Sequence, residues 1–535
     1  MSITIRKIDL ILISILVLFF SENVFAQTTG KIAGKVTDIK TGVPLPGTNI
    51  LVENTNLGAA ADQSGDFYII NLSPGIYTVK AQMIGYESVI VKNIRVSVNR
   101  TAYVNIIMTQ TVLKGQEVIV EAEKVTIKKD QTSTIKNVSS DKMEILPIES
   151  MTDVVSMQAG VVDGHFRGGR LTEVSYLIDG IQVDESFSGE GRSVDIEPET
   201  IEDLEVITGT FNAEYGKAMS GIVNAVTKEG RSKFHGSFSG AFGNYFTPHN
   251  DIFIGLKEGE LNRNQDYKFH LSGPILKDDI TFFLNYRYQN NKNHLNGIRR
   301  FVVTDYSDFS ADDSTSWYSE YNGDSAYVAM NRSKNRSIMG KFTAKLFKNL
   351  KVSLLYTLNN DEWHSYDHAF KYNPDGMAFS LRKSEMYAFN INHMLSSSLF
   401  YELKVSLLDN DYGWYLYKNP LDSNYIHDAY FTNAGCGFYT GGQQKGHVKR
   451  VMEDINTKFD ITWQLNKKHS LKSGFLYTQH TLDNQYYEIR NKYSGMEEEG
   501  VWEWDIIDGK KKRKYLYYEP LLMPDSSIYS DIYTV

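Results

Sequence analysis

The sequence predicts a mainly β chain that combines an N-terminal β-sandwich, a compact α+β domain and part of a transmembrane antiparallel β-barrel. Three observations lead to this prediction. Short β-rich runs separated by turn residues fill 30–110, a glycine-rich segment occupies 147–230, and long segments with a period of two follow from 231 onward. The 535 residues carry a net charge of −9 without a basic block, which argues against nucleic acid as a partner.

Residues 1–26 have the organisation of a signal peptide. Arg6 and Lys7 form a positive start, the almost wholly apolar run 10–20 follows, and 24–26 fits a small-residue cleavage site before Gln27. The alternative is a membrane-spanning helix, which needs about 20 apolar residues. The run covers only eleven residues, so we expect cleavage and export.

The segment 27–110 predicts a small antiparallel sandwich. Its β-rich runs are separated by TGVPLPG, DQSGD and LSPG, which carry the residues of tight turns. The order of these pieces resembles the carboxypeptidase regulatory-like domain, a transthyretin-like fold that is non-catalytic in its family. The segment contains no histidine, so it lacks the ligand set of a zinc peptidase.

A charged linker is expected over 111–146, and within it lies one β-prone run, Glu117-Val118-Ile119-Val120-Glu121-Ala122. This run has two interpretations. It is an ordinary edge strand of the neighbouring domain, or it is a segment that adds as a strand to the sheet of a partner. Its position between a sandwich and a compact domain favours the second interpretation.

The segment 147–230 predicts a compact domain that stops a pore. We expect a short helix over 150–158, with Ser150 as its N-cap and Asp153 completing the cap, and Gly160 just after its end. A strand and turn follow at 174–183. A second helix is expected to begin near Pro198, because acidic residues follow it as in a first helical turn.

From 231 to 535 the pattern predicts barrel strands. In 280–289, 352–359 and 458–465 an apolar or aromatic face alternates with a polar face, as expected for lipid outside and a filled lumen inside. Short connections near 273–279, 347–349, 396–398 and 466–468 alternate with long polar loops. The segments run roughly ten to thirteen residues, longer than the five or six typical of soluble strands.

The strand count predicts that the barrel continues beyond this sequence. We count about ten strands, and a barrel of that size has no room for a folded domain of about 85 residues. Barrels of 22 strands do hold such a domain. The sequence is therefore expected to be the N-terminal portion of a longer protein, with about 10 of 22 strands.

The middle of the chain resembles the TonB-dependent outer-membrane receptors. The resemblance rests on DVVSMQAGV (153–161), RGGR (167–170), LIDGIQV (177–183), IEDLEVITG (201–209) and AEYGKAMSGIVNAVTK (213–228). It implies a plug domain inside a 22-stranded barrel of the outer membrane, with the N-terminal domain and plug open to the periplasm. It also implies active transport of a scarce bulky ligand, with periplasmic TonB and its inner-membrane proton-motive complex as partners besides outer-membrane lipid.

The resemblance assigns roles to particular residues. Glu117 to Ala122 corresponds to the TonB box, the strand that TonB pairs with. Arg167, Arg170 and Glu205 stand where the family places charge contacts between plug and barrel. Five glycines are expected at positions that need a positive φ or a close backbone approach: Gly168, Gly169, Gly180, Gly216 and Gly221.

Several questions stay open at this level. The ligand is a small molecule or a glycan, with siderophore, cobalamin, oligosaccharide and peptide all possible. One family branch imports glycans beneath a lipoprotein lid, but the wording RGGRLTEVSYLIDG departs from that branch, so a lid lipoprotein stays an open partner. The alternative function is an outer-membrane receptor that binds, signals or adheres without transport.

The sequence offers no catalytic, cofactor or metal motif. It contains no G-x-S-x-G, H-E-x-x-H or P-loop, and its single cysteine, Cys436, excludes a disulfide framework. His364 and His368 are spaced for one face of a helix, but a lone pair in a loop is more often solvated. Loop aromatics such as Trp363, Tyr366 and Trp414 fit ligand stacking or an interfacial girdle equally well.

Overall fold

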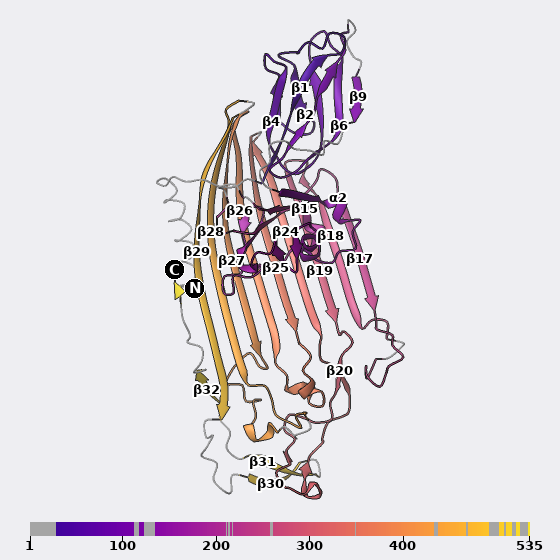
Figure 1. Cartoon of the computed structure of the whole chain (residues 1–535), viewed down its shortest axis with the longest axis vertical. Coiled ribbons are helices and arrows are strands. Elements are labelled where there is room, and N and C mark those ends of the chain that lie inside the picture. Colours follow the sequence, from indigo (N-terminus) through magenta and orange to yellow (C-terminus); the bar gives the residue numbers. More distant parts are fainter. Residues whose placement is uncertain are drawn as a thin grey trace.

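The computed structural model describes residues 28–111, 117–121, 134–209, 211, 215–216, 218–256, 260–347, 349–432, 437–466 and 469–491, and four short strands beyond them. The signal peptide, Ala122 and Cys436 lie outside these residues. Figure 1 shows a small β domain at one end of a long curved sheet, with the plug elements lying against that sheet. Among the described residues, no helix is long and apolar enough to cross a membrane.

The N-terminal domain, residues 28–111 with 117–121, is a sandwich of two sheets and is called the sandwich below. One sheet has the order β4-β1-β7 with β8 also on β1, and the other has the order β3-β2-β5-β6-β9. A single apolar core that includes Ile32, Ile50 and Phe67 lies between them. The pairs β1–β7, β1–β8 and β6–β9 are parallel, so the expectation of a purely antiparallel sandwich is wrong. Its strands are β1 (Gly30–Asp38), β2 (Asn49–Val52), β3 (Gly58–Ala60), β4 (Asp66–Leu72), β5 (Gly75–Gln82), β6 (Ser88–Val96), β7 (Thr101–Tyr103), β8 (Ile106–Met108) and β9 (Glu117–Glu121).

The plug, residues 134–230 of the structure, is built on a five-stranded sheet of order β10-β15-β16-β13-β14. The boundary expected at 147 falls inside this unit, because β10 (Thr134–Ser139) pairs with β15 along its whole length. The capped helix is confirmed as α3 (Met151–Ser156), in which Ser150 and Asp153 form a capping box. The remaining elements are α2 (Ser140–Met143), β11 (Val161–Val162), β12 (His165–Phe166), η1 (Leu171–Glu173), β13 (Val174–Ile178), β14 (Ile181–Gln182), η2 (Pro198–Thr200), β15 (Ile201–Thr208) and β16 (Gly221–Thr227).

The helix expected to begin near Pro198 is wrong. Only the single turn η2 forms, and β15 follows as a central strand between β10 and β16. Its residues are almost all buried, and its β-branched side chains suit a strand that is covered on both faces. The acidic residues that imitated a first helical turn are used otherwise, since Asp203 accepts from the backbone N–H of Val98 and from Asn137.

Nine long antiparallel strands follow in sequence order and form the sheet called the wall below. Inward and outward residues alternate as predicted: Thr281, Phe283 and Asn285 are buried against the plug side, while Leu284 is 38% exposed on the other face. Eight of the strands are longer than most of the predicted segments, because apolar alternation marks only the lipid-facing part of each strand. The nine are β17 (His235–Gly243), β18 (Asn264–Leu276), β19 (Ile280–Asn291), β24 (Ser333–Phe347), β25 (Leu350–Trp363), β26 (Phe379–Ser396), β27 (Leu399–Tyr415), β28 (Gly446–Gln464) and β29 (Ser470–Asn491).

The two ends of the wall differ. Short turns join the strands at the end nearest the sandwich, and long loops at the opposite end contain short elements of their own (Figure 1). The loop elements are β20 (Asn296–Ile298), β21 (Ser307–Asp308), η3 (Ser314–Ser316), β22 (Tyr318–Ser319), β23 (Tyr327–Ala329), η4 (His368–Phe370), η5 (Pro374–Gly376) and η6 (Asp428–Tyr430). Beyond β29, β30 (Trp502–Ile507) pairs with β31 (Lys510–Tyr515), whereas β32 (Pro520–Pro524) and β33 (Tyr533–Thr534) pair with β29.

Candidate functional site

The segment predicted to contact TonB forms an edge strand in the structure. Strand β9 lies parallel to β6, in a register that runs from Ser88 opposite Glu117 to Lys92 opposite Glu121. Ile119 and Val120 are 60% and 45% exposed, so this strand is held mainly by backbone pairing. The first of the two interpretations of this run therefore describes the present arrangement, and strand addition to TonB stays a prediction.

The plug is anchored to the wall through the turn of its LIDG motif. Asp179 and Gly180 have φ values of 50° and 76°, the left-handed pair of a type I′ turn between β13 and β14. The ammonium of Lys404 donates to the main-chain oxygen of Asp179 across 3.0 Å, and that of Lys458 donates to the oxygen of Gly180 across 3.2 Å. Lys341 binds the Asp179 carboxylate at 3.0 Å. Three wall lysines thus hold one tight turn.

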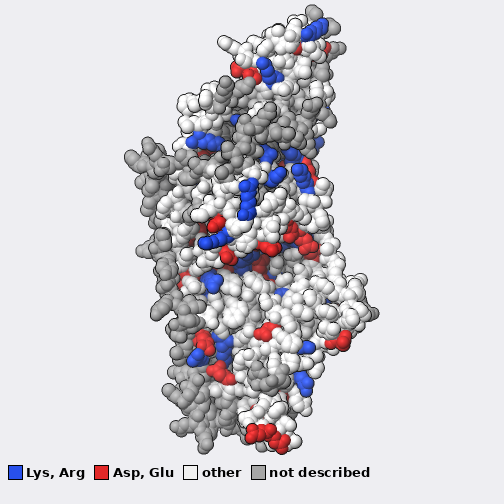
Figure 2. All heavy atoms as spheres, in the orientation of Figure 1, with Lys and Arg blue, Asp and Glu red and all other residues white. Residues whose placement is uncertain are grey.

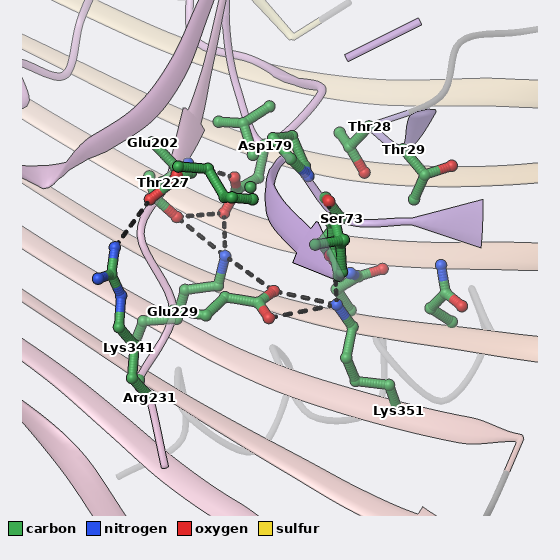
Figure 3. Close-up of a pocket in the computed structure, with 18 of the residues that line it drawn as sticks. Thr28, Thr29, Ser73, Asp179, Glu202, Thr227, Glu229, Arg231, Lys341 and Lys351 are labelled. Atoms are coloured by element: carbon green, nitrogen blue, oxygen red, sulfur yellow. Dashed lines mark hydrogen bonds and ion pairs between the residues drawn. The ribbon is translucent and has the colours of Figure 1, made fainter. Parts of the chain in front are cut away.

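A second anchor lies where the plug chain passes into the wall. The Glu229 carboxylate is 3.1 Å from the ammonium of Lys351 and 3.7 Å from that of Lys341 (Figure 3). Burial alone would raise the pKa of Glu229, but the attraction of Lys351 and Lys341 outweighs it and lowers that pKa to about 2. Glu229 is therefore fully ionised at neutral pH and remains paired.

Nearer the loops, the plug and wall are joined by arginine–carboxylate pairs. Arg287 of β19 contacts Glu197 at 2.6 Å, and Arg382 of β26 contacts Asp195 at 2.5 Å. Each arginine also binds a carboxylate of the wall, Asp266 or Asp361, at 2.7 Å. Such charge-assisted pairs are among the stronger polar contacts and fix the orientation of the residues 195–199.

Between these two charged levels the contact is apolar. Met339, Met386 and Met452 face inward from the wall and belong to the same buried cluster as the plug residues Val194 and Ile196. Methionine adapts its shape without a fixed geometry, so it suits a contact between surfaces that shift against each other. Figure 2 shows the basic side chains gathered below the sandwich, and mixed charge farther down the same face.

Arg167, Arg170 and Glu205 were predicted to make charge contacts with the barrel. In the structure, the hydrogen bonds of these three residues are with residues of the plug and the sandwich. The guanidinium of Arg167 donates to Thr134, the backbone N–H of Arg170 donates to Glu173, and buried Glu205 accepts from Asn99. Their contact with a barrel stays a prediction. The wall cations that do meet the plug were marked in the sequence by their inward position in the alternating pattern, as at Arg287 and Lys458.

Four of the five predicted glycines meet the expected requirement. Gly168 and Gly180 have positive φ, and an added Cβ at Gly169 or Gly221 would lie 2.3–2.4 Å from a neighbouring side chain. Gly216 shows neither feature: its φ is not positive, and no atom of the described residues lies within 4 Å of an added Cβ.

Two cavities lie on the loop side of the plug. One of about 340 Å³ is lined by Trp363, Tyr366 and Trp414, which come from two strands and a loop. A second of about 530 Å³ also has Trp363 in its lining and reaches Arg382 and the plug. His364 packs on Phe379, and His368 contacts the Tyr366 hydroxyl, so the two histidines have separate surroundings. The described residues include no group of three or more metal-ligating side chains.

Comparison with protein families matches two parts of the chain. Residues 32–120 match the CarboxypepD_reg-like domain, and residues 127–223 match the TonB-dependent Receptor Plug Domain. The first match includes most of β9, and the second begins before β10, in agreement with a plug sheet that starts ahead of residue 147.

Two curated proteins and one solved structure are similar to parts of this chain. The TonB-dependent transporter Oar of Myxococcus xanthus is 25% identical over 334 residues, which is 56% of this chain and 31% of Oar. The TonB-dependent receptor P39 of Formosa agariphila is 25% identical over 244 residues, 41% of this chain and 22% of P39. The outer membrane transporter YddB from Escherichia coli is 12% identical with a TM-score of 0.46, over 73% of this chain and 52% of YddB.

The chain thus spans less than a third of the two curated relatives it matches. Within that span a CarboxypepD_reg-like domain precedes a TonB-dependent receptor plug domain, and an antiparallel sheet follows both. By these matches, the chain is similar to the TonB-dependent receptors, with the regulatory-like domain and the plug domain as the matched parts.

Proposed function

We propose that the protein actively transports a scarce, bulky ligand across the outer membrane through a plugged barrel, with energy supplied through TonB. The observation that carries this proposal is the way the plug is held. Lys404 and Lys458 bind main-chain oxygens of the Asp179–Gly180 turn, so the contact is polar, specific and separable without unfolding the wall. A plug held by such contacts blocks passage until work is done on it.

The coupling to energy is assigned to Glu117–Ala122. An exposed edge strand offers its backbone to a partner, and pairing through the backbone tolerates side-chain variation. The periplasmic protein TonB, connected to the proton-motive complex of the inner membrane, is the proposed partner. In this scheme TonB takes β9 as an added strand and pulls, and the plug rearranges.

The ligand side is assigned to the loop end of the wall. Trp363 lines both cavities there, so an aromatic surface leads from the loops toward the plug. Siderophore, cobalamin, oligosaccharide and peptide remain the ligand classes, because stacking on an aromatic ring suits several of them. None of these steps requires a catalytic residue or a cofactor.

Uptake measured with and without a proton gradient tests the proposal. Cells that produce the protein are supplied with candidate ligands, and surface binding and internal accumulation are followed separately. Transport predicts that dissipating the gradient abolishes accumulation and leaves binding intact. Binding without gradient-dependent accumulation of any bound ligand would instead support the alternative, a receptor that signals or adheres.

A further inference from the structure

The sandwich touches the same lysines that hold the plug. Ser73, in the turn between β4 and β5, contacts the ammonium of Lys351 at 2.8 Å, and that ammonium also binds Glu229. Thr28 lies 3.2 Å from the ammonium of Lys404, which also donates to the main-chain oxygen of Asp179 in the plug. Each lysine therefore has one contact with the sandwich and one with the plug.

A third contact fastens the sandwich directly to the rim of the wall. The side chains of Asn71 and Asn392 exchange two hydrogen bonds, of 2.6 and 2.8 Å. Asn71 has a φ of 63° and lies near the end of β4, where the register with β1 shifts between Gly30 and Ile32. Asn392 also donates to Glu402, which accepts from Thr28 as well. The three sandwich residues thus share one polar network with the wall.

This network borders a partly open cavity of about 480 Å³ between sandwich, plug and wall (Figure 3). Two buried oxygens in its lining, Thr29 Oγ1 and Asn390 Oδ1, have no hydrogen-bond partner among the described residues. Unsatisfied polar atoms facing a roomy cavity are the usual sites of bound water. The cavity is therefore suited to holding ordered water beside the Lys341–Asp179 and Lys351–Glu229 pairs.

Enclosure strengthens these pairs. An ion pair at a low effective dielectric attracts far more strongly than the same pair open to bulk water, where exposed pairs contribute little. With the sandwich in place, the Lys341 and Lys404 side chains are 5% and 1% exposed and that of Lys351 is 24% exposed, and lifting the sandwich would admit more water to all three. The strength of the plug anchors thus depends on a domain that is not part of the plug.

Strand β9 pairs with the strand of the sandwich whose end contacts the plug. That strand is β6, and the end of β6 and the residues after it contact the plug through Arg95 with Asp141, Val98 with Asp203 and Arg100 with the main-chain oxygen of Ile135. A pull on β9 is therefore applied first to the sandwich edge that adjoins the plug.

We propose that the sandwich is a force-bearing seal over the seam between plug and wall, and that Thr28, Asn71 and Ser73 are positioning residues for the plug. Lifting the seal hydrates the lysine anchors and loosens the plug before the plug itself is pulled. The role of β9 as the point of attachment rests on the proposed function, whereas the sealing role does not.

The seal is tested without transport by the accessibility of the cavity. In a Cys436→Ser background, Asn390→Cys places a thiol in the cavity lining, and the purified protein is treated with a charged thiol reagent. Adding Asn71→Ala and Ser73→Ala should accelerate labelling by about tenfold or more, as expected for losing the three hydrogen bonds that these two side chains make with the wall. The control pair Asn56→Ala and Ser64→Ala, in exposed parts of the sandwich, should leave the rate unchanged. Equal labelling rates in all three proteins would overturn the seal.

The force-bearing role is tested in cells, with the wall lysines that anchor the plug left unchanged. Asn71→Cys and Asn392→Cys, joined by a short cleavable thiol cross-linker, hold the sandwich on the wall. Accumulation of ligand should be lost, surface binding retained, and accumulation restored on cleavage. A cross-link within the sandwich, between Leu51→Cys and Lys80→Cys, which face each other across β2 and β5, should have no effect. Normal accumulation with the sandwich fixed to the wall overturns this role. Failure of the proposed function is recognised separately, as gradient-independent accumulation in the protein without cross-links.

Discussion

Lys404 donates to the main-chain oxygen of Asp179 across 3.0 Å and lies 3.5 Å from the Glu402 carboxylate, so one buried ammonium joins a plug turn to the wall. Both Lys404 and Glu402 side chains are only 1% exposed. Bulk solvent therefore reaches neither charge, and each is stabilised by the other. The anchor is therefore a property of the pair and not of the lysine alone.

Replacing Lys404 with methionine should destabilise the plug by about 3–5 kcal/mol, because Glu402 is left as an uncompensated buried charge. The expected readout is a lower urea midpoint for protease cleavage of the plug in detergent-solubilised protein. Adding Glu402→Gln should recover much of the loss. Lys334→Met, at an exposed position of β24, is the matched control and should leave the midpoint unchanged. Equal midpoints for Lys404→Met and its control would refute the anchor.

Gly180→Ala should destabilise the same turn by about 1–2 kcal/mol, because the residue has a φ of 76° that L side chains rarely adopt. The added Cβ would also lie 3.0 Å from Thr28 and 3.1 Å from the Lys404 ammonium. Gly216→Ala provides the contrast, since it has neither constraint, and it should be neutral. Thermal unfolding of both variants gives the comparison, and a Gly216→Ala variant as unstable as Gly180→Ala would contradict this explanation.

Asp203 should make the plug less stable as pH rises toward neutrality. Burial raises its pKa to about 6, against the opposing hydrogen bonds from Val98 and Asn137. The folded state therefore keeps the proton more tightly than the unfolded state. This contribution is complete below the ordinary carboxyl pKa of about 4 and is lost as pH rises through about 6.

The variant Asp203→Asn keeps an acceptor oxygen and removes this titration. The free energy of unfolding of the variant minus that of the parent should be larger at pH 7.5 than at pH 4.5, by an amount on the order of 2 kcal/mol. Hydrogen exchange at the Val98 amide, which donates to Asp203, reports the same site locally. A difference between the proteins that is independent of pH would show that Asp203 does not titrate in this range.

The sequence was most informative where side-chain periodicity is fixed by burial. The even positions of 280–288 face outward and the odd positions 281–287 face the plug, because a one-residue slip would reverse every side chain. The cap of α3 was equally predictable, since Ser150 and Asp153 interact locally. Both are features that neighbouring residues determine on their own.

Tertiary context decided the features that were missed. The acidic start of 201–208 has the composition of a helix N-terminus, but pairing with β10 and β16 makes it a strand. The pairings that anchor the plug were missed because their two halves lie far apart in the chain, by 90 residues for Glu197 and Arg287 and by 162 for Asp179 and Lys341. The contact of Ser73 with Lys351, over 278 residues, requires the placement of three separate domains.

Val118→Pro tests the assignment of the TonB box. Proline has no N–H to donate to a ladder, so the variant should lose ligand accumulation while surface binding survives. Val118→Ala is the matched control, because it keeps the N–H, and backbone pairing should tolerate the smaller side chain. Since β9 pairs with β6 in the structure, the same proline also tests whether the sandwich keeps its strand. Hydrogen exchange of the β6 amides separates the two effects: faster exchange with normal accumulation would place the TonB contact elsewhere in the chain.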